Sequence, residues 1–200
     1  DGIIEGGQTM NPSTEDILHA AEQVPAMDVY VLPNNKNIVM AAEQAARLAR
    51  TSGVRHIHVV PTTTIPQGIS AMMAYDESAE IKDNVEAMQE AASRVQSGSV
   101  TFAARDSDYD GHQIHEGELL ALENGKVAFT GTDLGSVTAK VAKDLMREDS
   151  QFITLLYGAD VSEEQAADVE EAVRSLLPEE VELTVAYGGQ PVYYFLISVE

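Results

Sequence analysis

Uncharged polar side chains gather in three short stretches, each of which leads into a helical pattern. The stretches are residues 6–14 (Gly-Gly-Gln-Thr-Met-Asn-Pro-Ser-Thr), 33–37 (Pro-Asn-Asn-Lys-Asn) and 61–68 (Pro-Thr-Thr-Thr-Ile-Pro-Gln-Gly). Backbone N–H groups at a helix start bind anions and polar head groups, and the nearby amides and hydroxyls add further donors and acceptors. Lys36 is the only cation in these stretches. The pattern therefore predicts a site for a polar head group, a backbone segment or one phosphate, rather than for a polyanion.

Fifteen residues in these stretches and in a fourth one at 188–191 are predicted to bind a ligand or a partner. They are Gly6, Gly7, Gln8, Thr9, Asn11, Ser13, Asn34, Asn35, Asn37, Thr62, Thr63, Gln67, Gly68, Gly189 and Gln190. No catalytic residue is predicted. The alternative is that the hydroxyls and amides only cap helices and turns, as these residue types commonly do. Repetition of the pattern favours a site, while Gly189 and Gln190 either reach the same crevice or form a separate contact surface.

Two histidines and one acidic stretch are the candidate metal sites. His56 and His58 alternate on a predicted strand, so their rings share a face at a spacing that can chelate zinc. The third ligand would have to come from elsewhere, so we predict no metal site there. Residues 106–111 resemble the start of a calcium-binding EF-hand loop, but the position that needs a bidentate Glu is Gly117. We interpret this stretch as a connection rich in turn formers.

The elements that position the three polar stretches alternate between strand and helix. Residues 2–5 are typical of the end of a strand, and strands are expected at 28–32 and 54–60, each closed by a proline. One-sided apolar stripes predict helices at 15–24, 37–50, 67–75 and 80–96. Ser13 is expected to cap the first of these helices, with Asp16 as its capping-box partner. This alternation favours a parallel sheet with helical crossovers, whose loops gather at one edge.

The pattern changes after Ser97-Gly98-Ser99, where we place a boundary between subdomains at 1–97 and 98–200. Strands are expected at 100–104, 118–122, 126–130, 152–157, 181–187 and 192–199, and helices from near Asp133 and from Ser162 to Leu176. Asn124-Gly125 is a strong hairpin signal, and Ser162 with Gln165 forms a capping box. The predicted fold is therefore α/β: a small parallel α/β layer, followed by an α+β subdomain with a mixed or antiparallel sheet that ends in a hairpin.

Composition limits the partners and the compartment. The 200 residues include 33 acidic and 12 basic side chains, giving a formal charge of −21, which repels nucleic acid and anionic membrane surfaces. The chain has no Cys, so disulfides and thiolate chemistry are excluded. No signal peptide or long apolar span is present, so we expect a cytoplasmic, bacterial-type protein without membrane insertion. Because the chain starts at Asp1 without Met, we expect it to be a fragment of a longer protein.

Four motifs in order carry a resemblance to a known family. They are the stretch at 6–14, Leu-Pro-Asn-Asn-Lys-Asn-Ile at 32–38, Val-Pro-Thr-Thr-Thr-Ile-Pro-Gln-Gly at 60–68 and Tyr-Gly-Gly-Gln-Pro-Val-Tyr at 187–193. Together they resemble the C-terminal region of the fatty acid kinase A protein of bacteria, whose family is dihydroxyacetone-kinase-like and DegV-related. The resemblance covers essentially the whole chain.

The resemblance implies a two-part kinase that forms an acyl phosphate. Its N-terminal domain would hold Mg-ATP, and its C-terminal region would help engage a separate DegV-like protein that carries the fatty acid. This chain has no Gly-x-x-x-x-Gly-Lys-Ser/Thr loop and nothing like the family's acidic Mg²⁺ cluster, so we expect it to need no cofactor of its own and to turn over no ATP. The alternative is an independent small-molecule-binding or phosphotransfer domain of the dihydroxyacetone kinase type. The sequence leaves acyl-chain preference and homodimer formation open.

Overall fold

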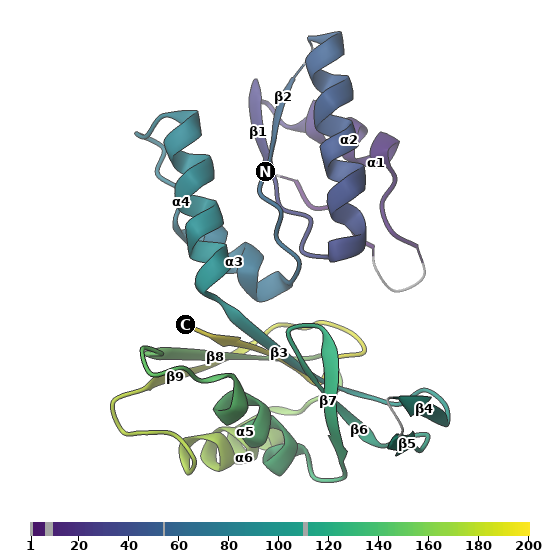
Figure 1. The fold of residues 1–200 in the computed structure, drawn as a ribbon, viewed down its shortest axis with the longest axis vertical. Helices are drawn as coiled ribbons and strands as arrows, with labels where there is room; N and C mark the ends of the chain where they lie inside the picture. The colour runs from purple at the N-terminus through teal and green to yellow at the C-terminus, as the bar shows by residue number, and fades with distance from the viewer. Residues whose placement is uncertain (1, 7–9, 54, 110–111) are drawn as a thin grey trace. The chain divides into compact units, whose positions relative to one another are not determined.

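A computed structural model describes residues 2–6, 10–53, 55–109 and 112–200 of the chain (Figure 1). The chain divides into two compact units, and the division falls between Arg94 and Val95. Unit 1 is the N-terminal one and unit 2 the C-terminal one.

Unit 1 is built on two short parallel strands. Strands β1 (Asp28–Val31) and β2 (His56–Val59) pair with Asp28 opposite His56 and Val31 opposite Val59, which confirms the predicted parallel arrangement. In Figure 1, α1 and α2 lie on one side of this pair, and α3 and α4 lie on the other. Their bounds are Thr14–Gln23 for α1, Lys36–Ser52 for α2, Ile65–Met73 for α3 and Ile81–Arg94 for α4.

Small residues let α2 approach the strands closely. Ala42, Ala45 and Ala49 are almost fully buried, in one cluster with Val29 of β1 and Ile57 of β2. Since side chains alternate along a strand, the residues next to Val29 on β1 and next to Ile57 on β2 face the opposite side. There a smaller core of Val60, Ala71, Met88 and Ala92 joins α3 to α4.

Unit 2 is a six-stranded mixed sheet with α5 and α6 on one face (Figure 1). The strand order is β7-β6-β3-β10-β8-β9, and only the β8–β9 pair is parallel. The bounds are Gln96–Phe102 for β3, Leu119–Glu123 for β6, Lys126–Gly131 for β7, Leu134–Leu145 for α5, Phe152–Tyr157 for β8, Glu163–Arg174 for α6, Glu182–Tyr187 for β9 and Phe195–Val199 for β10.

Several local signals of unit 2 are confirmed. Asn124 and Gly125 both have positive φ, 48° and 78°, as the tight turn between β6 and β7 requires. Asp133 caps α5 by accepting a hydrogen bond from the Ser136 N–H at 2.8 Å. The capping box of Ser162 and Gln165 is present at the start of α6.

The predicted terminal hairpin is wrong, because β9 and β10 are not neighbours. Strand β10 lies between β3 and β8, antiparallel to both, and β8 occupies the place beside β9. All five residues of β10 are buried. Strand β10 pairs along both of its edges with β3 and β8, whereas the predicted hairpin would have paired it with β9.

The Ser97-Gly98-Ser99 stretch lies inside β3, and the two units divide between Arg94 and Val95, a few residues before the predicted boundary. A Cβ at Gly98 would come within 2.5 Å of Val141 Cγ1 and 2.9 Å of Leu145 Cδ1, both on α5. The glycine therefore provides the space in which α5 packs on the sheet.

Two further expectations need correction. Residues 2–6 belong to no strand. Residues 107–109 of the acidic stretch, which was interpreted only as a connection rich in turn formers, form β4 (Ser107–Tyr109), and β4 pairs antiparallel with β5 (His112–Ile114). The Asp106 carboxylate precedes it and accepts a hydrogen bond from the Glu116 N–H at 2.7 Å.

Replacing Gly98 with Val should destabilise unit 2 by about 1–3 kcal/mol, because the new side chain would overpack the contact with α5. Ser99→Val is the matched control, since the next residue on the strand points to the other face of the sheet. Urea unfolding of both variants measures the difference. Equal losses would show that the packing at Gly98 is not the cause.

Candidate functional site

The loops that follow β1 and β2 are joined by a reciprocal pair of hydrogen bonds. The Asn34 N–H donates to Thr62 Oγ1 at 3.1 Å, and the Thr62 hydroxyl donates to Asn34 Oδ1 at 2.8 Å. Thr62 is only 1% exposed, and Asn34 adopts the left-handed conformation with φ of 53°. The structure thus brings these two predicted site residues together at the carboxyl edge of the parallel strands.

Gly68 and Gln67 of α3 complete this cluster. A Cβ at Gly68 would lie 2.1 Å from Asn34 Oδ1, so the absence of a side chain there lets Asn34 sit against α3. The Gln67 side-chain carbonyl accepts hydrogen bonds from the Thr63 N–H at 2.8 Å and the Thr63 hydroxyl at 2.9 Å. Thr64 accepts from the Gln67 N–H and caps α3, a role that the sequence analysis missed because it placed the helix start later.

Two other predicted site residues act as helix caps. Asn35 caps α2 by accepting from the Asn37 N–H at 2.9 Å, while the Asn37 side chain has no assigned role. Ser13 caps α1 and exchanges hydrogen bonds with Asp16, which confirms that capping box. Hydrogen bonds from Ser13 hold the pKa of Asp16 below its usual value, so the carboxylate stays charged at the helix N-terminus.

The opening stretch is described only in part. Gly6 lies against Pro12, because a Cβ on Gly6 would come within 2.7 Å of Pro12 Cδ. Asn11 is exposed. Gly7, Gln8 and Thr9 lie outside the described residues, so their place in the site stays a prediction.

Gly189 and Gln190 belong to unit 2, where they shape the connection from β9 to β10. The Gln190 side-chain amide donates to the Leu156 carbonyl at 2.8 Å, and Gly189 has φ of 66°. Val192 in the same connection also has positive φ, 70°, which is rare for a β-branched residue. The Thr101 hydroxyl donates to the Val192 carbonyl at 2.7 Å and holds it in place.

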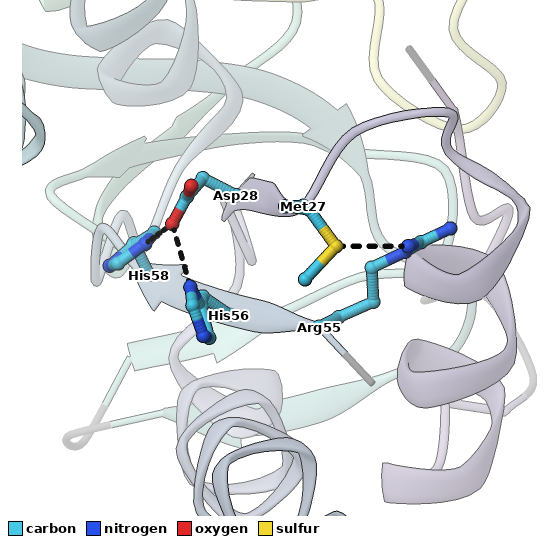
Figure 2. A network of polar contacts seen from close by, with 5 residues as sticks. All are labelled: Met27, Asp28, Arg55, His56 and His58. Carbon is cyan, nitrogen blue, oxygen red and sulfur yellow. Dashed lines mark hydrogen bonds and ion pairs between the residues drawn. The ribbon is translucent and has the colours of Figure 1, made fainter. Parts of the chain in front are cut away.

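The two histidines of β2 converge on one carboxylate, as Figure 2 shows. Asp28 Oδ1 lies 3.2 Å from His56 Nδ1 and 2.9 Å from His58 Nε2. The rings share a face as predicted, but one nitrogen of each ring points to the same oxygen of Asp28. Across the described ranges, no group of three or more His, Asp or Glu side chains is arranged to hold a metal ion.

Asp28 was missed by the sequence analysis, although it is the centre of this cluster. The hydrogen bond from His58, and then that from His56, holds its pKa below the usual value, against the effect of burial. The ring of Tyr30 packs 5.5 Å from that of His58, and burial raises the pKa of Tyr30. The parallel register that places Asp28 opposite His56 is the signal that could have identified it.

A groove of about 580 Å³ lies in unit 2. Residues 146–152, Pro178 and 180–182 line it. Glu148, Asp149, Glu180 and Glu182 outnumber the one basic residue, Arg147, so the lining is acidic overall and disfavours a phosphate or carboxylate ligand. Among the described residues, no helix combines the length and apolarity needed to cross a membrane.

The fold is shared by two groups of solved structures. The dihydroxyacetone kinase from C. freundii in complex with AMP-PNP and Mg²⁺ matches with a TM-score of 0.71 and 17% identity, over 94% of this chain and 41% of that one. A DegV family protein from Ruminococcus gnavus matches with a TM-score of 0.64 and 13% identity, over 94% and 77%. The Streptococcus pneumoniae fatty acid kinase B3 protein, loaded with linoleic acid, matches with a TM-score of 0.62 and 13% identity, over 94% of this chain and 76% of that one. The chain thus has a DegV and dihydroxyacetone-kinase-like fold.

Sequence comparison identifies the family. The profile of the FakA-like C-terminal family, where FakA is the A component of fatty acid kinase, matches residues 1–200, and this chain belongs to that family. Protein YloV of Bacillus subtilis is 41% identical over 198 residues, and protein SH1689 of Staphylococcus haemolyticus is 43% identical over 198 residues. Each match covers 99% of this chain but only 35% of the relative, so the chain spans about a third of the length of these proteins.

Thr62→Val should lower the stability of unit 1 by about 1–3 kcal/mol, because it leaves the half-buried backbone N–H and side-chain oxygen of Asn34 without their partner. Thr63→Val is the matched control at the exposed neighbouring position and should cost less. Thermal or urea unfolding compares the two. If Thr62→Val left stability unchanged, the Asn34–Thr62 bonds would not hold the loops.

The pKa of Asp28, measured by carboxyl NMR titration, should lie below 3.8 and should rise in His58→Ala, with a smaller rise in His56→Ala. Because the folded-state pKa is the lower one, the stability that Asp28 contributes is present above pH 3.8 and is lost as pH falls through the folded-state value. Asp28→Asn should remove this part of the acid sensitivity. An Asp28 pKa unchanged by either histidine substitution would contradict the assignment.

Proposed function

We propose that this chain is the non-catalytic C-terminal domain of a fatty acid kinase, and that it docks a DegV-like protein carrying a fatty acid. A separate nucleotide domain of the parent protein would hold Mg-ATP and phosphorylate the presented carboxylate. The observation that supports this most is the match of the FakA-like C-terminal family to the whole chain. The parent would act in the cytoplasm, where the acyl carrier and ATP are available.

The length of the relatives agrees with this division of labour. The matched region is 35% of each curated relative, which leaves room for a nucleotide domain in the remainder. This chain has no phosphate-binding loop of the Gly-x-x-x-x-Gly-Lys-Ser/Thr type. We therefore assign ATP binding to the remainder and partner binding to this region.

The polar edge of unit 1 is our candidate for part of the contact surface. Asn34 and Thr62 fix the shape of the loops from within, while Asn11, Asn37 and Thr63 are exposed and present amide and hydroxyl groups. Such groups suit a polar backbone segment or a head group better than a polyanion. In this view capping and binding are divided between neighbouring residues of the same loops.

A second candidate function is an independent small-molecule-binding or phosphotransfer domain of the dihydroxyacetone kinase type. The TM-score of 0.71 to that kinase favours it. A covalent hydroxyketone site would need a histidine free in a loop cleft, whereas His56 and His58 lie on a strand with Asp28 between them. A thermal-shift screen with short hydroxyketones and phosphates tests this candidate, which predicts a raised melting temperature.

The docking proposal predicts that this fragment retains a DegV-like acyl carrier loaded with fatty acid in a pull-down. An unrelated acidic protein of similar size serves as control for charge effects. Retention should persist when ATP is omitted, because the docking surface lies outside the nucleotide domain. Failure of several loaded carriers to bind either the fragment or the full-length parent would reject the proposal.

The same proposal predicts that the purified fragment hydrolyses no ATP, while the full-length parent with its loaded carrier consumes ATP and forms acyl phosphate. A coupled ADP-release assay with and without Mg²⁺ compares them. Magnesium-dependent turnover by the fragment alone would show that the region is catalytic.

A further inference from the structure

Helix α3 presents an apolar face to the outside of unit 1. Ile65, Ile69, Met72 and Met73 follow one another at helical spacing, with exposed fractions of 43%, 43%, 63% and 82%. We call these four side chains the α3 face. The opposite side of the helix is buried through Pro66, Gly68, Ser70 and Ala71, so packing within unit 1 already uses the other half of α3.

The surroundings of the α3 face are uncharged and then acidic. Residues 61–75 contain no charged side chain, although 22% of the whole chain is charged. Directly after them come Asp76, Glu77 and Glu80, and Lys82 nearby is paired with Glu86 at 3.6 Å. The apolar face thus has an acidic margin at its C-terminal end.

We propose that the α3 face docks the acyl-carrying protein, through a surface of that partner that is apolar at its centre and carries Lys or Arg at its rim. This inference rests on the proposed function and adds the location and the chemistry of the contact. Exposed apolar patches with a polar rim mark interaction sites, and an acidic rim selects a basic counterpart. Flexible methionine side chains also suit a partner that binds and leaves.

Charge argues against the other occupants of this face. A second copy of the chain would bring its own formal charge of −21 toward the acidic margin. A free fatty acid or an anionic membrane would likewise place negative charge against Asp76, Glu77 and Glu80. A basic-rimmed protein surface satisfies both the apolar centre and the acidic margin.

The α3 face also adjoins the polar loops. Ile69 follows Gly68, against which Asn34 sits, and Gln67 of the same helix holds Thr63. One partner surface could therefore cover the apolar helix face and the exposed polar groups of the neighbouring loop together. Apolar contacts would supply affinity there, and the loop would supply orientation.

The test measures the affinity of the full-length parent for its DegV-like carrier by calorimetry, with the carrier loaded with fatty acid. Met73→Asp should weaken binding by about tenfold or more, because it places a charge in the apolar centre of the contact. Met40→Asp on α2 is the matched control, since Met40 is 78% exposed and equally flexible, and it should change affinity by less than about twofold.

The acidic margin is tested by Glu77→Lys with Glu80→Lys. This double variant should weaken binding, and it should flatten the loss of affinity that rising salt causes in the unaltered parent. Affinity that is unchanged in both the Met73→Asp and the charge-reversal variants would overturn the inference while leaving the proposed function intact. Absence of binding by the unaltered parent would reject the proposed function itself.

Two further measurements separate the remaining occupants. Light scattering should give the same mass for Met73→Asp and the unaltered parent, and the melting temperature should shift by no more than about 2 °C. A change in oligomeric mass would show that a second copy covers the α3 face. A large loss of thermal stability would show that another part of the parent covers it. Either result would overturn the inference.

Discussion

Parallel pairing of two four-residue strands is the constraint on which unit 1 depends. A two-stranded sheet is marginally stable alone, and parallel strands cannot be joined by a tight turn. Each strand must therefore gain support from helices on both of its faces and from the loops at its end. The Asn34–Thr62 hydrogen bonds tie the carboxyl ends of β1 and β2 together. The same pairing brings the predicted polar loops at 33–37 and 61–68 together at one edge and places α3 directly after the second of them.

Local signals carried most of the predicted fold. Capping boxes at Ser13 and Ser162, the Asn124-Gly125 turn and the strand at 152–157 were correct because neighbouring residues determine them. The place of β10 in the sheet was not predicted correctly, since it depends on pairing with β3 and β8, which are distant in sequence. Gly98 shows the same limit: a glycine between two serines is typical of a linker, and only the packing of α5 reveals why it lies in a strand.

The candidate site was harder to predict because one residue type serves two purposes. Asn and Ser are suited both to capping a helix and to contacting a ligand, and the sequence does not separate the roles. The structure assigns Asn35 and Ser13 to capping and Thr62 to an internal bond. Asp28 was missed for another reason: its partners lie about 30 residues away and become neighbours only in the parallel register.

The central position of β10 has a consequence for how unit 2 folds. Phe195 of β10 pairs with Val100 of β3 on one side and with Tyr157 of β8 on the other. Strands β3 and β8 therefore do not pair directly with each other. The two halves of the sheet share no strand-to-strand hydrogen bonds until β10 inserts between them. Pairings that distant in sequence slow folding, whereas the strand pairing of unit 1 spans a shorter stretch of chain. During synthesis, unit 1 can therefore reach its structure while the sheet of unit 2 is still open.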